Sequence, residues 1–170
     1  MIITYELSEE SINQAIKQLE QYKKDIHNKT ELLRQKVVEM LAEEIQQGFN
    51  GAIVDDIIGS PKQADVRVSI DNKGDITLVI ADGEDAVWVE FGAGVYYNGT
   101  AGSSPHPKGA EMGFTIGDFG KGNGKKRTWG YYDEDGNLNV THGTLALMPM
   151  SRAMITVCNN IQEIAKEVFA

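Results

Sequence analysis

Forty consecutive residues near the start of the chain, Ser8 to Gln47, contain neither glycine nor proline. Large apolar residues recur every seven positions in this stretch, at Ile12, Leu19, Ile26, Leu33 and Met40. This spacing places them on one face of an α-helix. At 1.5 Å per residue the helix would be about 60 Å long. A small domain is narrower than that, so part of the helix is expected to project or bend.

The sequence also marks the ends of this helix. Ser8 is a good N-cap, and the two glutamates that follow it lie where the helix dipole favours negative charge. Gly48, Asn50 and Gly51 are expected to end the helix, and the polar run 27–30 is its weakest point. A second row of helix positions, spaced by sevens from Ile16, is only half apolar, so a free-standing coiled coil is not predicted. Its positions are Ile16, Lys23, Thr30, Val37 and Glu44.

Beyond Pro61 the apolar period changes from helical to alternating. Residues 66–70 and 76–80 alternate apolar and polar side chains around the turn 72–75, which predicts an antiparallel hairpin. A second hairpin is predicted from 128–132 and 138–141, with an Asp-Gly step in its turn.

Two further segments complete the chain. Residues 92–127 hold ten glycines and two of the four prolines without sustained periodicity, which predicts a long loop. Residues 151–169 are predicted to form a helix with Ser151 as its cap. One face of that helix would carry Ala153, Val157, Ile161, Ile164 and Val168.

These segments predict an α+β fold in one domain spanning residues 1–170. A long N-terminal helical arm (1–49) precedes a region of sheet and loop (50–150), in which two hairpins with the glycine-rich loop between them build an antiparallel sheet. A C-terminal helix (151–170) is expected to pack on that sheet.

Composition narrows the class of protein. Twenty-five acidic against sixteen basic side chains give a net charge of −9, which argues against broad contact with nucleic acid. Residues 101–170 nevertheless carry seven charges of each sign, including the basic cluster Lys121, Lys125, Lys126 and Arg127. The N-terminus lacks a signal-peptide pattern, and no apolar run approaches the ~20 residues of a membrane helix. We therefore expect a soluble protein made in the cytoplasm.

A search for chemistry predicts no catalytic, cofactor-binding or metal-binding residues. Cys158 lies in the apolar pattern of the last helix and is expected in the core. The acidic run 133–135 lacks EF-hand spacing and fits a hairpin turn better. Asp85 is expected to be a solvated cap for a short helical turn at 86–90. The glycines before Lys125 do not match a phosphate-binding loop.

Several short stretches, in a fixed order, resemble one protein family. They are Ala86–Gly94, Ser104–Pro107, Trp129–Tyr132, His142–Gly143 and Leu147–Ala153. Together they resemble the tail-completion, or neck, proteins of long-tailed bacteriophages, also described as head-tail joining or minor tail proteins. The resemblance covers roughly residues 30–168. Ala93 departs from the threonine that is common in the family, and the glycine-rich loop looks like an elaboration.

The resemblance implies a structural subunit of the virion, without catalytic residues or cofactors. It implies a ring, of six copies, assembled in the bacterial host cytoplasm at the head-tail junction of a phage, prophage or phage-tail-like particle. The partners would be the head connector and the tail terminator or tail tube, with DNA only in passage. The residues that match the family are Glu90, Phe91, Gly92, Trp129, Pro149 and Ala153.

The expected roles of these residues are structural. Phe91 and Trp129, with Trp88, are expected as core aromatics, Gly92 as a backbone requirement and Pro149 as a helix start. Glu90 lies in an apolar run and must be exposed or paired. We expect it to form a salt bridge within or between subunits.

Two alternatives remain open at this stage. The first is a tail-associated cell-wall hydrolase that uses His106, His142 and nearby acids. The second is a nucleic-acid-binding module that uses the basic loop 121–127, which could equally touch DNA passing through a channel.

Overall fold

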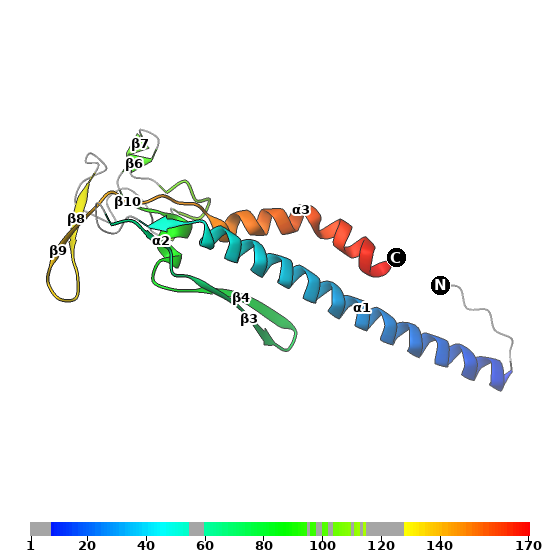
Figure 1. Ribbon diagram of the computed structural model, residues 1–170. Helices are drawn as coiled ribbons and strands as arrows, with labels where there is room; N and C mark the ends of the chain where they lie inside the picture. Colours follow the sequence, from blue (N-terminus) through cyan, green and yellow to red (C-terminus); the bar gives the residue numbers. More distant parts are fainter. Residues whose placement is uncertain are drawn as a thin grey trace.

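The computed structural model describes residues 8–54, 60–94, 96–97, 100–101, 104–109, 111–112, 114 and 128–170. It confirms the α+β fold, with a long N-terminal helix, antiparallel hairpins and a C-terminal helix packed beside them (Figure 1). The helices are α1 (Glu9–Asn50), α2 (Ala86–Phe91) and α3 (Pro149–Phe169). The strands are β1 (Ile53–Val54), β2 (Lys62–Gln63), β3 (Arg67–Lys73), β4 (Ile76–Asp82), β5 (Ala93–Gly94), β6 (Tyr96–Tyr97), β7 (Thr100–Ala101), β8 (Trp129–Tyr132), β9 (Leu138–Thr141) and β10 (Gly143–Thr144).

Helix α1 is continuous over 42 residues. Ser8 caps it as predicted, since its hydroxyl accepts a hydrogen bond from the Ser11 N–H at 3.3 Å. The polar run 27–30 does not break the helix, which ends one turn beyond Gln47 with Gly51 as its C-cap. The first half of α1 extends past the end of α3 (Figure 1), so the predicted excess length projects.

Helix α3 lies antiparallel along α1 (Figure 1). The Lys36 ammonium pairs with Glu167 at 3.0 Å near the far end of the contact. Four of the five predicted core positions are buried, but Ile161 is 44% exposed. Cys158 is also exposed, contrary to the prediction. Both errors have one cause, because α3 is apolar over a wider face than α1 alone covers.

The hairpin β3–β4 packs on another side of α1. Its strands pair in register from Arg67 with Asp82 to Lys73 with Ile76, around a turn in which Gly74 has φ +63°. The Gln46 amide of α1 bonds the backbone at both Val66 and Val68, at 3.1 and 2.9 Å. Arg34 donates to the Gly74 carbonyl at 2.8 Å, so α1 holds the hairpin at both ends.

The second predicted hairpin, β8–β9, is also present. The Asn137 backbone N–H donates to the Asp133 carboxylate at 2.7 Å across its turn. This bond, with donors from the Asn139 and Asn137 amides, lowers the pKa of Asp133. The acidic run therefore serves as a hairpin turn, as the sequence predicts.

The strands do not join into a continuous sheet within the described residues. Each of the five strand pairs forms its own two-stranded antiparallel sheet. The segment predicted as one long loop contains β5, β6 and β7, and β5 pairs with the distant β10. Two-residue strands are too short to produce a readable period, which explains why the sequence pattern missed them.

The core lies where the C-terminal end of α1, α2 and the start of α3 meet. Phe49, Ala52 and Val89 are fully buried there. The other members of this cluster are Ile45, Val54, Val66, Ala86 and Ala153. Within the described part of the chain, no helix combines the length and apolar character needed to cross a membrane.

The contact of α1 with the start of α3 generates a testable prediction at Gly48. A Cβ added there would lie 2.6 Å from Pro149 Cβ and 3.3 Å from its Cα. A glycine-to-alanine change inside a helix ordinarily stabilises by about 1 kcal/mol. Because the proline ring and backbone cannot move aside cheaply, we expect Gly48→Ala to lower the free energy of unfolding by about 1–3 kcal/mol, measured by urea denaturation.

Gly51 provides the matched control. Its φ of −88° suits alanine, and an added Cβ would meet no atom closer than 3.9 Å. Gly51→Ala should change the free energy of unfolding by no more than about 0.5 kcal/mol. Equal effects of the two substitutions would contradict the proposed close contact.

Candidate functional site

Glu90, the residue that resisted a core interpretation, is the centre of a buried polar site. It lies on α2, a short helix whose Ala86 and Val89 face the core. The Glu90 side chain is only 5% exposed. A carboxylate buried to this extent needs several partners to offset the loss of its hydration.

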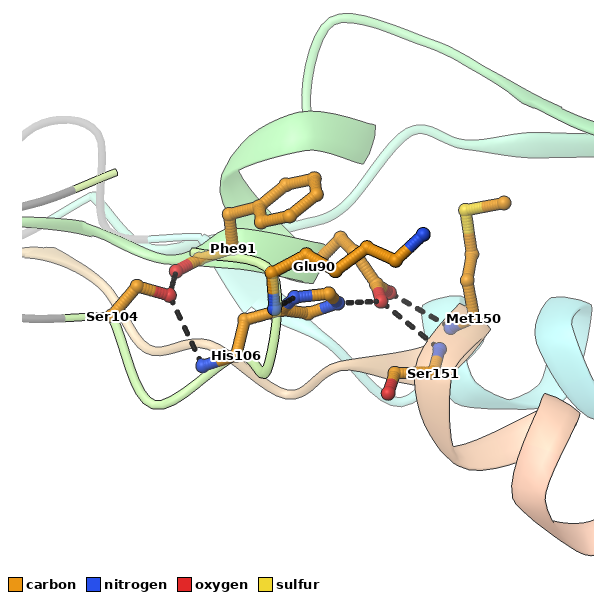
Figure 2. A network of polar contacts seen from close by, with 7 residues as sticks. Glu90, Phe91, Ser104, His106, Met150 and Ser151 are labelled. Carbon is orange, nitrogen blue, oxygen red and sulfur yellow. Dashed lines mark hydrogen bonds and ion pairs between the residues drawn. The ribbon is translucent and has the colours of Figure 1, made fainter. Parts of the chain in front are cut away.

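The Glu90 carboxylate has three partners from two distant segments (Figure 2). Oε2 accepts a hydrogen bond from the Met150 N–H at 2.8 Å. Oε1 accepts one from the Ser151 N–H at 3.0 Å and lies 2.9 Å from Nε2 of His106. Glu90 is therefore paired within one chain, by two backbone N–H groups and the His106 ring.

The two backbone bonds explain how α3 begins. Met148 occupies the N-cap position in the left-handed conformation, with φ 57° and ψ 45°, and offers no capping side chain. Pro149 follows at the first helical position, as predicted, but Ser151 lies inside the first turn and is not the cap. The first N–H groups of a helix have no partner within the helix, and they form its positive end. Glu90 satisfies two of them and so caps α3 from another helix.

Residue Val89 extends this connection. Its carbonyl accepts hydrogen bonds from the N–H groups of Leu147 at 2.9 Å and Met148 at 3.4 Å. Since Pro149 has no N–H, every backbone donor from Leu147 to Ser151 is directed at Val89 or Glu90. The entry into α3 is thus held entirely by the end of α2.

His106 is fixed through both ring nitrogens. The Lys108 N–H donates to Nδ1 at 3.0 Å, which makes Nδ1 an acceptor and assigns the ring proton to Nε2. Nε2 then donates to Glu90, and the imidazole can do so in its neutral form. Ser104 completes the loop, because its hydroxyl donates to the Phe91 carbonyl and accepts from the His106 N–H at 3.2 Å.

Aromatic rings cover this polar cluster. The rings of Phe91 and Phe114 stack with centroids 4.5 Å apart, and Phe91 lies 4.3 Å from the His106 ring. Trp88 meets Phe114 edge to face at 6.4 Å. These rings keep water away from the carboxylate, which strengthens its hydrogen bonds. We call Glu90, Phe91, Ser104, His106, Met150 and Ser151 together the Glu90 junction.

Gly92 lets the chain leave α2 toward this loop. It has φ 80° and ψ 149°, a conformation that residues with a Cβ rarely adopt, and its N–H bonds the Trp88 carbonyl at 2.7 Å. Its predicted role as a backbone requirement is thus supported by the geometry.

The structure places the family-matching residues as follows. Glu90 and Phe91 belong to the junction, Pro149 starts the helix that Glu90 caps, and Ala153 is buried one turn later. The backbone of Trp129 belongs to β8, but its side chain is outside the described part of the chain. The basic cluster Lys121, Lys125, Lys126 and Arg127 falls outside the described residues as well.

One acidic residue corrects a prediction. Asp85 occupies the N-cap position of α2, but its side chain makes no capping bond and is buried instead of solvated. Its Oδ2 accepts from the Asp65 N–H at 3.0 Å and lies 3.8 Å from the Lys62 ammonium. Asp85 therefore ties the segment before β3 to α2.

The hydrogen bonds of the junction suit a structural role. A serine nucleophile needs its hydroxyl directed at a general base. Here the Ser104 hydroxyl is directed at a backbone carbonyl, and Nδ1 of His106 is taken by a backbone N–H. His142 is exposed between β9 and β10 and does not belong to the junction. Across the described residues no three His, Cys, Asp or Glu side chains are grouped to hold a metal ion.

Sequence reasoning missed the partnership of His106 with Glu90. Two features of the sequence could have indicated this partnership. One is the acidic residue within an apolar run, which needs a partner, and the other is the histidine between two prolines. Comparison with known proteins adds no relative, because no family model, curated protein or solved structure matches the chain.

Removing the Glu90 carboxylate tests the junction. Glu90→Ala leaves two helix N–H groups and the His106 donor buried without an acceptor, so the free energy of unfolding should fall by about 3–5 kcal/mol. Glu90→Gln keeps one acceptor oxygen but turns an NH₂ group toward a backbone donor, and it should cost about 1–3 kcal/mol. Denaturant unfolding followed by circular dichroism measures both.

Glu163, which lies on α3, is the matched control. It is largely exposed and pairs with Lys166 one turn away, so Glu163→Ala should change the free energy of unfolding by about 0.5 kcal/mol or less. If Glu90→Ala were as mild as this control, Glu90 would not be the cap of α3.

Proposed function

We propose that this protein is a non-enzymatic structural subunit of the head-tail junction of a tailed phage or phage-derived particle. Copies form a closed ring that joins the head connector to the tail. The proposal starts from the resemblance to tail-completion proteins and takes its support from the geometry of the Glu90 junction.

One observation carries the proposal. The motifs that resemble the family are separated by up to sixty positions in the chain, yet Glu90, Phe91, Ser104, His106 and Pro149 meet at one joint. Their shared task is to fix the start of α3 against α2. Motifs of a catalytic family would be expected to converge on an open site with an unengaged nucleophile or base. The convergence on a closed joint favours a building block.

Charge and shape agree with this proposal. The net charge of −9 suits a ring through which DNA passes without being retained. Elements reach out from the core in two directions, with α1 at one end and the hairpin β8–β9 at the other (Figure 1). Such extensions can contact neighbours in a ring or the components above and below it.

Particles from the source strain provide the test. We expect mass spectrometry of purified particles to detect this chain in a fixed ratio to the connector. Deleting its gene should leave filled heads and separate tails in electron micrographs. Complementation with Glu90→Ala should fail to restore joined particles, whereas His142→Ala should restore them, because His142 lies outside the junction.

Two results would overturn the proposal. The first is the formation of normal infectious particles without the gene. The second is clearing of a bacterial cell-wall suspension by the purified protein, with loss of clearing in His142→Ala, which would establish the hydrolase alternative.

A further inference from the structure

The His106 ring is a buried titratable group whose two nitrogens are both engaged (Figure 2). Its side chain is only 7% exposed. Nε2 donates to the Glu90 carboxylate at 2.9 Å, and Nδ1 accepts from the Lys108 N–H at 3.0 Å. Because a backbone N–H can only donate, the ring in this arrangement carries a single proton, on Nε2.

A second proton on this ring would face another donor. Histidine is the side chain that ordinarily changes its charge between pH about 5 and about 8. On His106 the added proton must bind Nδ1, since Nε2 already carries one. The protonated Nδ1 and the Lys108 N–H would then be two donors directed at each other across 3.0 Å. The ring and the Lys108 backbone must therefore separate.

Glu90 determines which of the two moves. Its carboxylate attracts an imidazolium more strongly than a neutral ring, so the bond to Nε2 becomes charge-assisted and shorter. The same carboxylate keeps its bonds to the N–H groups of Met150 and Ser151, which do not involve the ring. The ring therefore stays with Glu90, and the Lys108 backbone is displaced.

Few charged residues lie on the segments that meet at the ring. On α2, Glu90 contacts the ring, whereas Asp85 lies at the other end of the helix and is paired with a lysine. The other charged side chains on the described parts of these segments are exposed, and they are Arg152 on α3 and Lys108 and Glu111 in the segment of His106. Exposed charges are screened by solvent, so Glu90 dominates the electrostatics of the ring.

The Lys108 backbone also supports part of the aromatic cover. The Lys108 carbonyl accepts from the Met112 N–H at 3.0 Å, and the next carbonyl, of Gly109, accepts from the Phe114 N–H at 2.8 Å. The Phe114 ring stacks on Phe91 with the centroids 4.5 Å apart. Displacing Lys108 therefore moves the backbone that holds Phe114 over the Glu90 junction.

We propose that the bond from the Lys108 N–H to Nδ1 of His106 is a pH-sensitive latch. With a neutral ring the latch is closed, and His106 holds both Glu90 and the Lys108 backbone. When Nδ1 takes a proton from water the latch opens, and the support of Phe114 shifts. Glu90 keeps His106 and the start of α3, so acid loosens the aromatic cover and leaves the capping of α3 intact.

The latch is independent of the proposed ring of subunits, because it concerns bonds within one chain. It can be tested on the purified full-length protein, and failure of either proposal leaves the other standing.

Nitrogen NMR of protein with labelled histidine tests the protonation. The chain has three histidines, so three rings are observed, and the signal lost in His106→Asn identifies the ring of interest. We expect His106 to carry its proton on Nε2 alone at pH about 7.5 and protons on both nitrogens at pH about 5.5. Two protons at the higher pH, or one at the lower pH, would overturn the proposal.

Hydrogen exchange of single amides tests the release. Relative to its intrinsic rate at each pH, the Lys108 N–H should lose at least about tenfold of its protection between pH about 7.5 and about 5.5. The Met150 and Ser151 N–H groups should keep their protection, since Glu90 still accepts from both. Unchanged protection of Lys108 would contradict the latch, and so would a parallel loss at all three amides, which would mean that the whole junction opens.

Two substitutions separate the two bonds of the ring. Asparagine can accept from an N–H two residues further on, as in an Asx turn, and it takes up no proton. His106→Asn should therefore keep the Lys108 N–H protected at both pH values. Glutamine can reach Glu90 as a donor but leaves Lys108 without its acceptor, so His106→Gln should leave that N–H unprotected at both. A loss of protection with falling pH in either variant would refute the assignment to His106.

Discussion

A carboxylate buried at the start of a helix that lacks its own cap organises this molecule. Glu90 belongs to α2, but it satisfies the first free N–H groups of α3 and at the same time fixes His106 in the following loop. The negative charge is stable in this place because three donors and the positive end of a helix surround it. Helix α2, the loop and α3 can therefore be positioned only together, and the core against α1 depends on that placement.

Sequence patterns predicted the elements in which the apolar period and the capping or turn residues indicate the same structure. The length of α1, its cap at Ser8 and both hairpins follow from residues that are neighbours in the chain. The core face of α3 was also predicted, except at Cys158 and Ile161. Its cap was misplaced at Ser151, because local rules search for a capping side chain at the helix start and this helix obtains its cap from sixty residues upstream.

Part of the candidate site was singled out from the sequence, but its geometry was not predicted. Glu90, Phe91 and Pro149 were singled out from the sequence, and the need of Glu90 for a partner was recognised. Periodicity cannot identify that partner, because His106 lies in a segment without regular structure. The pairing of β5 with β10 was missed for the same reason, since two residues on each side leave no pattern.

The capping of α3 by Glu90 also has a consequence for the order of folding. Helix α1 and the hairpin β3–β4 consist of local contacts and can form early, whereas the start of α3 needs a contact across sixty residues. Closing so long a loop carries an entropy cost that short-range structure does not. During synthesis Glu90 and the segment that follows it leave the ribosome before α3, so the first turn of α3 gains its acceptor only when that segment has collapsed and brings the two together. We therefore expect docking of α3 to be a late step of folding, and until then the faces of α1 and α3 that later pack together stay open to other chains.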